Sequence, residues 1–165
     1  MRVAIGSDDA GYALKEVIRQ YLEERGVEMR DFGVPSASPS DTDYPDVARA
    51  VAEAVASGQE ERAILVCGTG IGMAMTANKI PGVRAAQAYD VYSAERARKS
   101  NDAQVLALGA RVIGSELAKS VVDAFLASDF AGGNSTRKVE KMQRIDAEYR
   151  QSTRPRRNAA NDRET

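Results

Sequence analysis

The hydrophobic positions of this chain change period along the sequence. Short uninterrupted apolar runs begin at Val3 and Ala63, and such runs are typical of strands buried on both faces of a parallel sheet. Between the runs, apolar residues recur at helical spacing. One such set predicts a helix with one inward face, namely Leu117, Val121, Val122 and Phe125.

The pattern therefore predicts strands that alternate with helices. Strands are expected over residues 3–5, 27–32, 63–66, 83–87 and 103–108. Helices are expected over 12–25, 43–55, 73–79, 90–99, 114–126 and 136–150. Strands joined by helices require right-handed crossovers and helices on both faces of the sheet. The expected fold class is α/β: a three-layer Rossmann-like sandwich around a five-stranded parallel sheet.

Composition adds limits to this picture. We expect one domain over residues 1–150, and a disordered polar tail over 151–165, which has no apolar residue beyond alanine. The net charge of −1 gives no general attraction to nucleic acid or to an anionic membrane, so neither is expected as a partner. The only cysteine rules out an internal disulfide, and the chain runs directly into a strand without a signal peptide. Both features predict a cytoplasmic protein.

The chain contains no histidine. That absence removes the commonest general base and metal ligand, and it excludes Ser-His-Asp and Cys-His catalytic arrangements. Acid–base chemistry must then use Cys, Asp, Glu, Lys or Tyr.

The strongest chemical signal is the segment Cys67-Gly-Thr-Gly-Ile-Gly72, which joins a predicted strand to a predicted helix. Its glycines permit close approach of a ligand to the backbone. A helix N-terminus supplies free N–H groups and a positive dipole for an anion, and a thiol there is a candidate for activation. The spacing differs from a dinucleotide fingerprint, and no Gly-Lys-Ser/Thr follows as in a P-loop. A tight turn with a structural cysteine remains the alternative.

Ligands of open parallel sheets bind beyond the carboxyl ends of the strands. We therefore expect the loops that carry polar residues to face one side together: 7–11, 41–46, 67–72, 89–93 and 100–102.

These loops, in this order, resemble the ribose-5-phosphate isomerase B and galactose-6-phosphate isomerase family over about residues 1–150. The segments that carry the resemblance are Val3-Ala-Ile-Gly-Ser-Asp8, Asp31-Phe-Gly33, Asp43-Tyr-Pro45, Ile64-Leu-Val-Cys-Gly-Thr-Gly-Ile-Gly-Met73, Ala77-Asn-Lys79, Tyr92-Ser-Ala94, Asn101-Asp102, Val105-Leu-Ala107, Arg111-Val-Ile-Gly114 and Gly132-Gly133.

The resemblance implies aldose–ketose isomerisation of a sugar or sugar phosphate through an enediolate, with no metal and no cofactor. It assigns Cys67 as the base, the loop amides of Gly68 to Gly72 and the Thr69 hydroxyl to the enediolate oxygens, and Asp8 to the sugar hydroxyls. It also implies a homodimer, or a tetramer, with sites at the subunit interface. Further substrate-binding positions follow from the match: Tyr44, which also suits a packing role, and Gly68, Gly70, Ile71, Gly72, Asn101 and Arg111.

The chain departs from the family pattern where that pattern has histidine or arginine. Asp9 and Ser100 replace two histidines, the second of which opens the sugar ring in the family. Asn134 replaces the first of two phosphate-binding arginines, and Lys138 stands at the second, beside Arg137. Lysine supplies charge but no bidentate fork.

These departures predict that ribose 5-phosphate is a poor substrate. They leave open a four-carbon sugar phosphate, which closes no stable ring, or a sugar without phosphate. The loss of every histidine also leaves open a non-catalytic metabolite-binding relative, and the same enediolate would serve a lyase or an epimerase.

Overall fold

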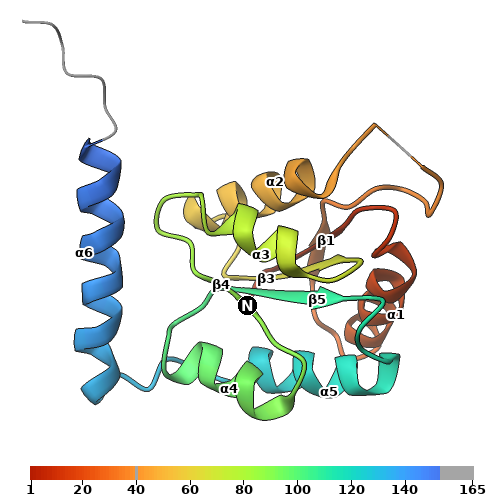
Figure 1. Cartoon of the computed structure of the whole chain (residues 1–165). Helices are drawn as coiled ribbons and strands as arrows, with labels where there is room; N and C mark the ends of the chain where they lie inside the picture. Colours follow the sequence, from red (N-terminus) through yellow and green to blue (C-terminus); the bar gives the residue numbers. More distant parts are fainter. Residues whose placement is uncertain (40, 153–165) are drawn as a thin grey trace, which may run out of the picture.

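The computed structural model describes residues 1–39 and 41–152, and its centre is a five-stranded parallel sheet with helices on both faces (Figure 1). The strand order is β2-β1-β3-β5-β4. In chain order the elements are β1 (Val3–Ser7), α1 (Tyr12–Glu23), β2 (Met29–Asp31), α2 (Tyr44–Ala56), β3 (Arg62–Cys67), α3 (Ile71–Ala77), β4 (Ala85–Gln87), α4 (Val91–Lys99), β5 (Val105–Gly109), α5 (Ser115–Leu126), the 3-10 turn η1 (Gly133–Ser135) and α6 (Thr136–Ser152). The predicted fold class is confirmed.

Each face of the sheet has its own hydrophobic core, because successive side chains of a strand point to opposite faces. Ile64 and Leu106 pack against α1, α4 and α5. Leu65 and Ala107 pack against α2 and α3. The two helix layers appear above and below the sheet in Figure 1. The three central strands are buried on both sides, which explains their uninterrupted apolar runs.

Local signals set most of the element ends. Gly26 takes a φ of 73° after α1, a conformation that glycine adopts without steric cost. Asp43 and Asp46 form a capping box at the start of α2, which satisfies amides that the first helical turn leaves free. The predictions ran too long for β2 and β4, which are the two edge strands and each have one pairing neighbour. The inward placement of Leu117 was wrong: it lies at the margin of the buried stripe of α5 and is 48% exposed.

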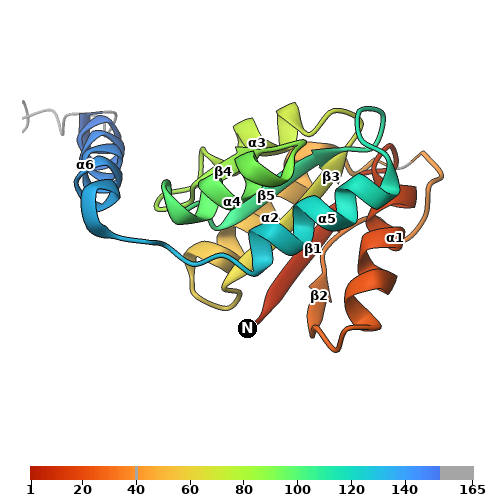
Figure 2. The same cartoon turned by 90° about the horizontal axis from the view of Figure 1, so that it is seen from below.

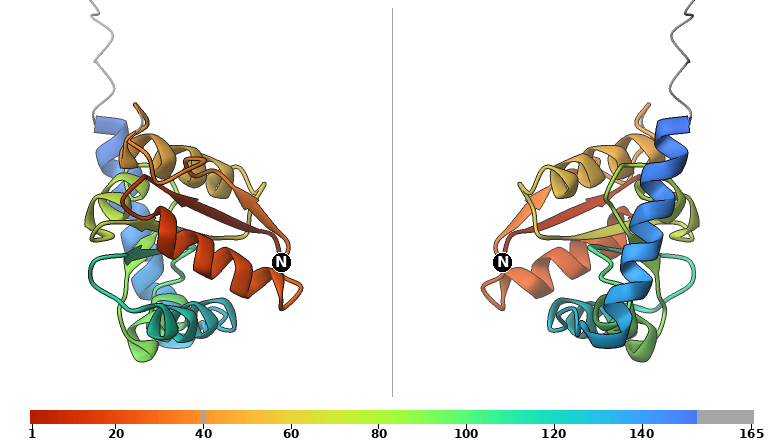
Figure 3. Two further views of the ribbon diagram at one scale, coloured as in Figure 1. Left: turned by 90° about the vertical axis from the view of Figure 1, so that its right-hand side faces the viewer. Right: turned by 90° about the vertical axis from the view of Figure 1, so that its left-hand side faces the viewer.

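The last helix, α6, stands apart from the sandwich, beyond the amino-terminal ends of β4 and β5 (Figures 2 and 3). Its hydrogen bonds to the sandwich come from its far half, where Arg150 Nη1 donates to the Lys79 carbonyl at 2.9 Å. The helix continues through Ser152, so the prediction that it ends at residue 150 was two residues short. The rest of the predicted disordered tail, 153–165, lies outside the described residues.

None of the helices that the structure describes combines the length and the apolar character needed to cross a bilayer.

Candidate active site

A pocket of about 460 Å³ opens at the carboxyl ends of the central strands. It is built from the loops that follow β1, β3 and β5 and from the start of α2. This is the location that the parallel topology predicts for a ligand. The residues that line it are Asp8, Ala10, Tyr44, Cys67, Gly68, Thr69, Ile71, Gly72, Met75 and Arg111.

Cys67 is the last residue of β3 and is buried, with 4% of its surface exposed. Its Sγ accepts a hydrogen bond from the backbone N–H of Gly70 over 3.1 Å. Gly70 adopts a φ of +75° and caps α3. A Cβ at this position would also come within 2.9 Å of the Leu108 backbone. Only glycine therefore allows the loop to turn tightly enough to bring this amide to the sulfur.

The glycine loop has two of its amides already engaged. The Gly70 N–H is directed at Cys67, and the Ile71 N–H donates to Thr69 Oγ1 at 3.4 Å. The predicted role of the loop amides in holding substrate oxygens therefore applies to the amides other than those of Gly70 and Ile71. Tyr44 lies against Gly72, where an added Cβ would meet its ring at 2.5 Å. Tyr44 thus combines the packing role and the pocket-lining role that the sequence left open.

Asp8 is the buried carboxyl group of the pocket, with 8% exposure. Its Oδ1 accepts the Gly11 N–H at 2.9 Å. Burial raises the pKa of Asp8 above its ordinary value, and the charge of Asp9 adds to this, while the Gly11 N–H and the Arg111 guanidinium oppose it. The Arg111 guanidinium lies 3.6 Å from where a Cβ of Gly68 would be. The pocket therefore joins a thiol, a carboxyl group that burial favours in its neutral form, and a cation.

The expectation that the loop 100–102 faces this pocket was wrong. This loop follows α4 and precedes β5, so it lies at the amino end of the sheet. Cys67 pairs with Gly109 at the other end of β5. β5 runs from Val105 to Gly109, so its ends are roughly 13 Å apart. Ser100 and Asn101 therefore cannot share a substrate with Cys67 of the same chain.

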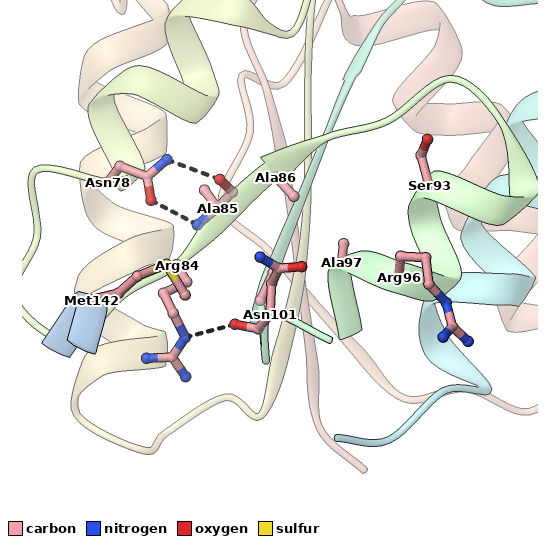
Figure 4. A pocket seen from close by; sticks show the side chains of 10 residues that line it. Asn78, Arg84, Ala85, Ala86, Ser93, Arg96, Ala97, Asn101 and Met142 are labelled. Atoms are coloured by element: carbon pink, nitrogen blue, oxygen red, sulfur yellow. Dashed lines mark hydrogen bonds between the residues drawn. The ribbon is translucent and has the colours of Figure 1, made fainter. Parts of the chain in front are cut away.

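Asn101 lines a second hollow of about 410 Å³ beside β4, together with Arg84, Arg96 and Met142 (Figure 4). Its backbone is held firmly. Arg84 Nε donates to the carbonyl of Asn101 at 3.2 Å and to that of Asp102 at 2.9 Å.

Asp102 also stabilises the backbone turn that carries Asn101. It has a φ of 50°, which is uncommon for a residue with a Cβ. Its carboxylate binds Arg84 at 2.6 Å and Arg98 at 3.0 Å. Arg98 is only 3% exposed, so Asp102 neutralises a buried charge and holds the turn that presents Asn101.

The predicted phosphate-binding residues also lie away from Cys67. Asn134 belongs to η1, and Arg137 and Lys138 begin α6. All three are exposed. The start of α6 lies at the end of the molecule beyond the amino ends of the strands (Figure 2). The predicted site residues thus form two groups at opposite ends of the sheet.

Two residues that contact the glycine loop beside Cys67 were not predicted from the sequence. Gln87 ends β4 and Tyr89 follows it, and both side chains donate to the backbone carbonyl of Thr69. Sequence offers no signal for a side chain that binds a backbone carbonyl of a distant loop. The only indication was that Tyr89 follows the carboxyl end of a predicted strand.

Known proteins are similar to this chain in sequence and in fold. The profile of the family described as Ribose/Galactose Isomerase matches residues 3–142. A Ribose-5-P isomerase B of Listeria innocua is 52% identical, over 91% of this chain and 100% of its own. A D-erythrulose-4-phosphate isomerase of Pectobacterium atrosepticum is 51% identical, over 86% of this chain and 93% of its own.

A solved structure agrees with these matches. The ribose-5-phosphate isomerase B of Clostridium thermocellum is 46% identical, with a TM-score of 0.87 over 90% of this chain and 99% of its own. Family, relatives and fold lead to one conclusion, and the pocket around Cys67 is consistent with it: this chain belongs to the ribose/galactose isomerase family and is an aldose–ketose isomerase.

Proposed function

We propose that the protein isomerises a four-carbon sugar phosphate through an enediolate, with Cys67 as the base. The observation that carries the choice of substrate is Ser100, which stands where the family has its ring-opening histidine, in a chain without any histidine. A four-carbon aldose phosphorylated on its last oxygen has no free hydroxyl to close a five-membered ring. Such a substrate needs no ring-opening residue. The similarity to a D-erythrulose-4-phosphate isomerase, at 51% identity, supports the same choice.

The chemistry assigns one task to each group of the pocket. The Cys67 thiolate removes the proton from the carbon next to the carbonyl and returns it to the neighbouring carbon. The Thr69 hydroxyl and the remaining loop amides stabilise the charge on the enediolate oxygens. The raised pKa of Asp8 suits it to exchange a proton with those oxygens. Arg111 supplies a positive charge to an anionic intermediate.

We infer further that two copies of the chain complete each other's sites in a homodimer. Asp8, Cys67 and Arg111 line the pocket at one end of the sheet. The other group is at the opposite end and consists of Ser100, Asn101, Asn134, Arg137 and Lys138. A second copy would supply the second group to the pocket of the first.

The helix α6 supports this arrangement. It stands off the sandwich (Figure 1), and it exposes Met142 and Ile145, by 39% and 57%. Apolar residues three apart on an exposed helix form one stripe, and a stripe of this kind favours burial against a partner. A second copy is the partner that would also bring Arg137 and Lys138 to a phosphate.

A substrate comparison tests the proposed function. Erythrose 4-phosphate, erythrulose 4-phosphate, ribose 5-phosphate and the unphosphorylated sugars are compared by NMR of solvent proton exchange at the reacting carbons. We expect the four-carbon phosphates to give the highest kcat/KM. Fastest turnover of ribose 5-phosphate, at an ordinary rate of about 10 s⁻¹, would contradict the substrate. Binding without exchange for every compound would favour a non-catalytic relative. The single cysteine supports a cytoplasmic location for the enzyme.

A further inference from the structure

The carbonyl oxygen of Thr69 accepts two hydrogen bonds from side chains that come from the end of β4. Gln87 Nε2 donates to it at 2.6 Å, and the Tyr89 hydroxyl donates to the same oxygen. β4 is the edge strand beside β5 and does not line the Cys67 pocket. Gln87 at the end of this strand and Tyr89, two residues beyond it, therefore both donate to a single backbone atom of the glycine loop.

The same peptide group donates to the sulfur of Cys67. The Thr69 carbonyl and the Gly70 N–H belong to one peptide bond, and no described peptide bond is cis. In a trans peptide the C=O and the N–H point in opposite directions. Gln87 and Tyr89 hold one end of this group, and the other end donates to Cys67 Sγ at 3.1 Å. Donors on a carbonyl polarise the amide and strengthen the hydrogen bond that its N–H makes.

The peptide has little freedom to turn away. A Cβ at Gly109 would lie 2.6 Å from the Thr69 carbonyl carbon. A Cβ at Gly70 would lie 2.9 Å from the Leu108 backbone. The loop therefore lies directly on the end of β5, and only the rotation of the peptide plane remains to be fixed. Gln87 and Tyr89 fix that rotation.

We propose that Tyr89 and Gln87 are positioning residues, which hold the Thr69–Gly70 peptide in the orientation that stabilises the ionised form of Cys67. A donor directed at a thiolate favours the charged form. The role of the thiolate as base rests on the proposed function, whereas the ionisation of the thiol is measured independently of it.

Three other ionisable side chains line the pocket around Cys67. Asp8 comes from the end of β1, Tyr44 from α2 and Arg111 from the loop after β5. Burial raises the pKa of Tyr89, the hydrogen bond from Gln87 opposes this, and the charge of Cys67 raises it further. Tyr89 therefore keeps its proton at neutral pH and remains a donor to Thr69.

The experiment uses the fact that the chain has one cysteine. The rate of alkylation by iodoacetamide is measured from pH 5 to pH 10 on the full chain, for the wild type, Tyr89→Phe and Gln87→Met. Each substitution removes one donor and keeps most of the side-chain volume. We expect each variant to be alkylated about threefold to tenfold more slowly at pH 7, with the midpoint of its profile about half a unit to one unit higher.

Tyr21→Phe is the matched control. It removes a tyrosine hydroxyl that donates to Asp123 at 2.5 Å, between α1 and α5. Its alkylation profile should equal that of the wild type. Unchanged profiles for both Tyr89→Phe and Gln87→Met, in protein that unfolds at the wild-type temperature, would overturn the proposal. An equal shift in Tyr21→Phe would also overturn it, because general loosening would then be the cause.

The assignment of Cys67 as the base and the positioning role of Gln87 and Tyr89 can be contradicted independently of each other. If Cys67→Ser retains wild-type turnover, Cys67 is not the base, but the alkylation midpoints of Tyr89→Phe and Gln87→Met must still shift. If those midpoints do not shift while Cys67→Ser is inactive, the base assignment stands and the positioning role is wrong.

Discussion

Cys67 and Asn101 lie at opposite ends of the sheet within one chain. Cys67 ends β3 and pairs with Gly109 at the carboxyl end of β5, whereas Asn101 precedes the first residue of β5. A substrate in the pocket around Cys67 cannot reach Asn101 of the same subunit. If both residues act on one substrate, they must come from different subunits.

Complementation between two inactive variants tests this arrangement. Cys67→Ser and Asn101→Ala should each be inactive or weak, and co-expression should restore activity. We expect about a quarter of wild-type activity, because about half of the dimers are hybrids and each hybrid has one intact site. Hybrid dimers, verified by mass spectrometry, that remain inactive would exclude a shared site. A monomer by light scattering with full activity would do the same.

Replacement of the base should separate chemistry from binding. Cys67→Ser is expected to lower turnover by about 10²–10⁴-fold, which is the usual contribution of a positioned base. Unfolding temperature and ligand binding should stay near wild type, since the hydroxyl is smaller than the thiol but still accepts from Gly70. The measurements are single-turnover kinetics and calorimetric binding. Turnover near the wild-type rate would exclude Cys67 as the base.

Ring opening can be tested by restoring the residue that the family uses. Ser100→His is expected to raise the turnover of ribose 5-phosphate by about 10²-fold, the lower range for acid–base assistance. It should leave the turnover of a four-carbon phosphate unchanged, because that substrate has no ring to open. Ser115→His, at an exposed position that starts α5, is the control. Equal effects on both substrates would refute this explanation of specificity.

The glycine loop packs directly against the end of β5, so alanine substitutions at Gly109 and at Gly114 should have very different effects on activity. Gly109→Ala places a Cβ 2.6 Å from the Thr69 backbone, so the loop must move and turnover should fall at least about tenfold. Gly114→Ala meets no atom within 4 Å and has a φ of −75°, so it should be neutral. Steady-state kinetics and thermal unfolding of both variants provide the comparison. Equal activities would mean that the loop adapts without loss of function.

Glu16 forms ion pairs with Arg19 and with the buried Lys15, and these pairs should stabilise the fold less at low pH. Lys15 Nζ lies 2.8 Å from Glu16 and 2.5 Å from Asp31. Hydrogen bonds from Arg19 and then Lys15 lower the pKa of Glu16 from 4.5 to about 2. The lowered pKa stabilises the fold above pH 4.5, and this stabilisation is lost as the pH falls toward 2. We expect a loss of about 1–3 kcal/mol from this group.

Urea unfolding between pH 6 and pH 2.5 measures this loss. Glu16→Gln keeps the size of the side chain and removes the titration, so the variant should show a flatter pH dependence than the wild type. Parallel curves for the two proteins would show that Glu16 does not contribute.

The fold and the part of the candidate site around Cys67 could be predicted from the sequence. The apolar runs of β1, β3 and β5 specify buried parallel strands, because such runs bury both faces of a strand. Cys67 with Gly68, Gly70 and Gly72 marked the strand-to-helix loop. A side chain is excluded at Gly70 by its positive φ and the Leu108 backbone of β5, and at Gly72 by the Tyr44 ring. These signals are local, so they can be read from the order of residues.

The contacts between distant segments follow from the arrangement of the elements in space. The end of the sheet at which Asn101 lies follows from its place between a predicted helix and a predicted strand, whereas its distance from Cys67 depends on the length of β5 and on the pairing of β5 with β3. The contacts of Gln87 and Tyr89 with Thr69 depend on β4 lying beside β5, which follows strand order and not chain order. A backbone carbonyl accepts a hydrogen bond from any suitable donor, so its partner leaves no pattern in the sequence. Contacts of this kind become visible only when the strands are placed in space.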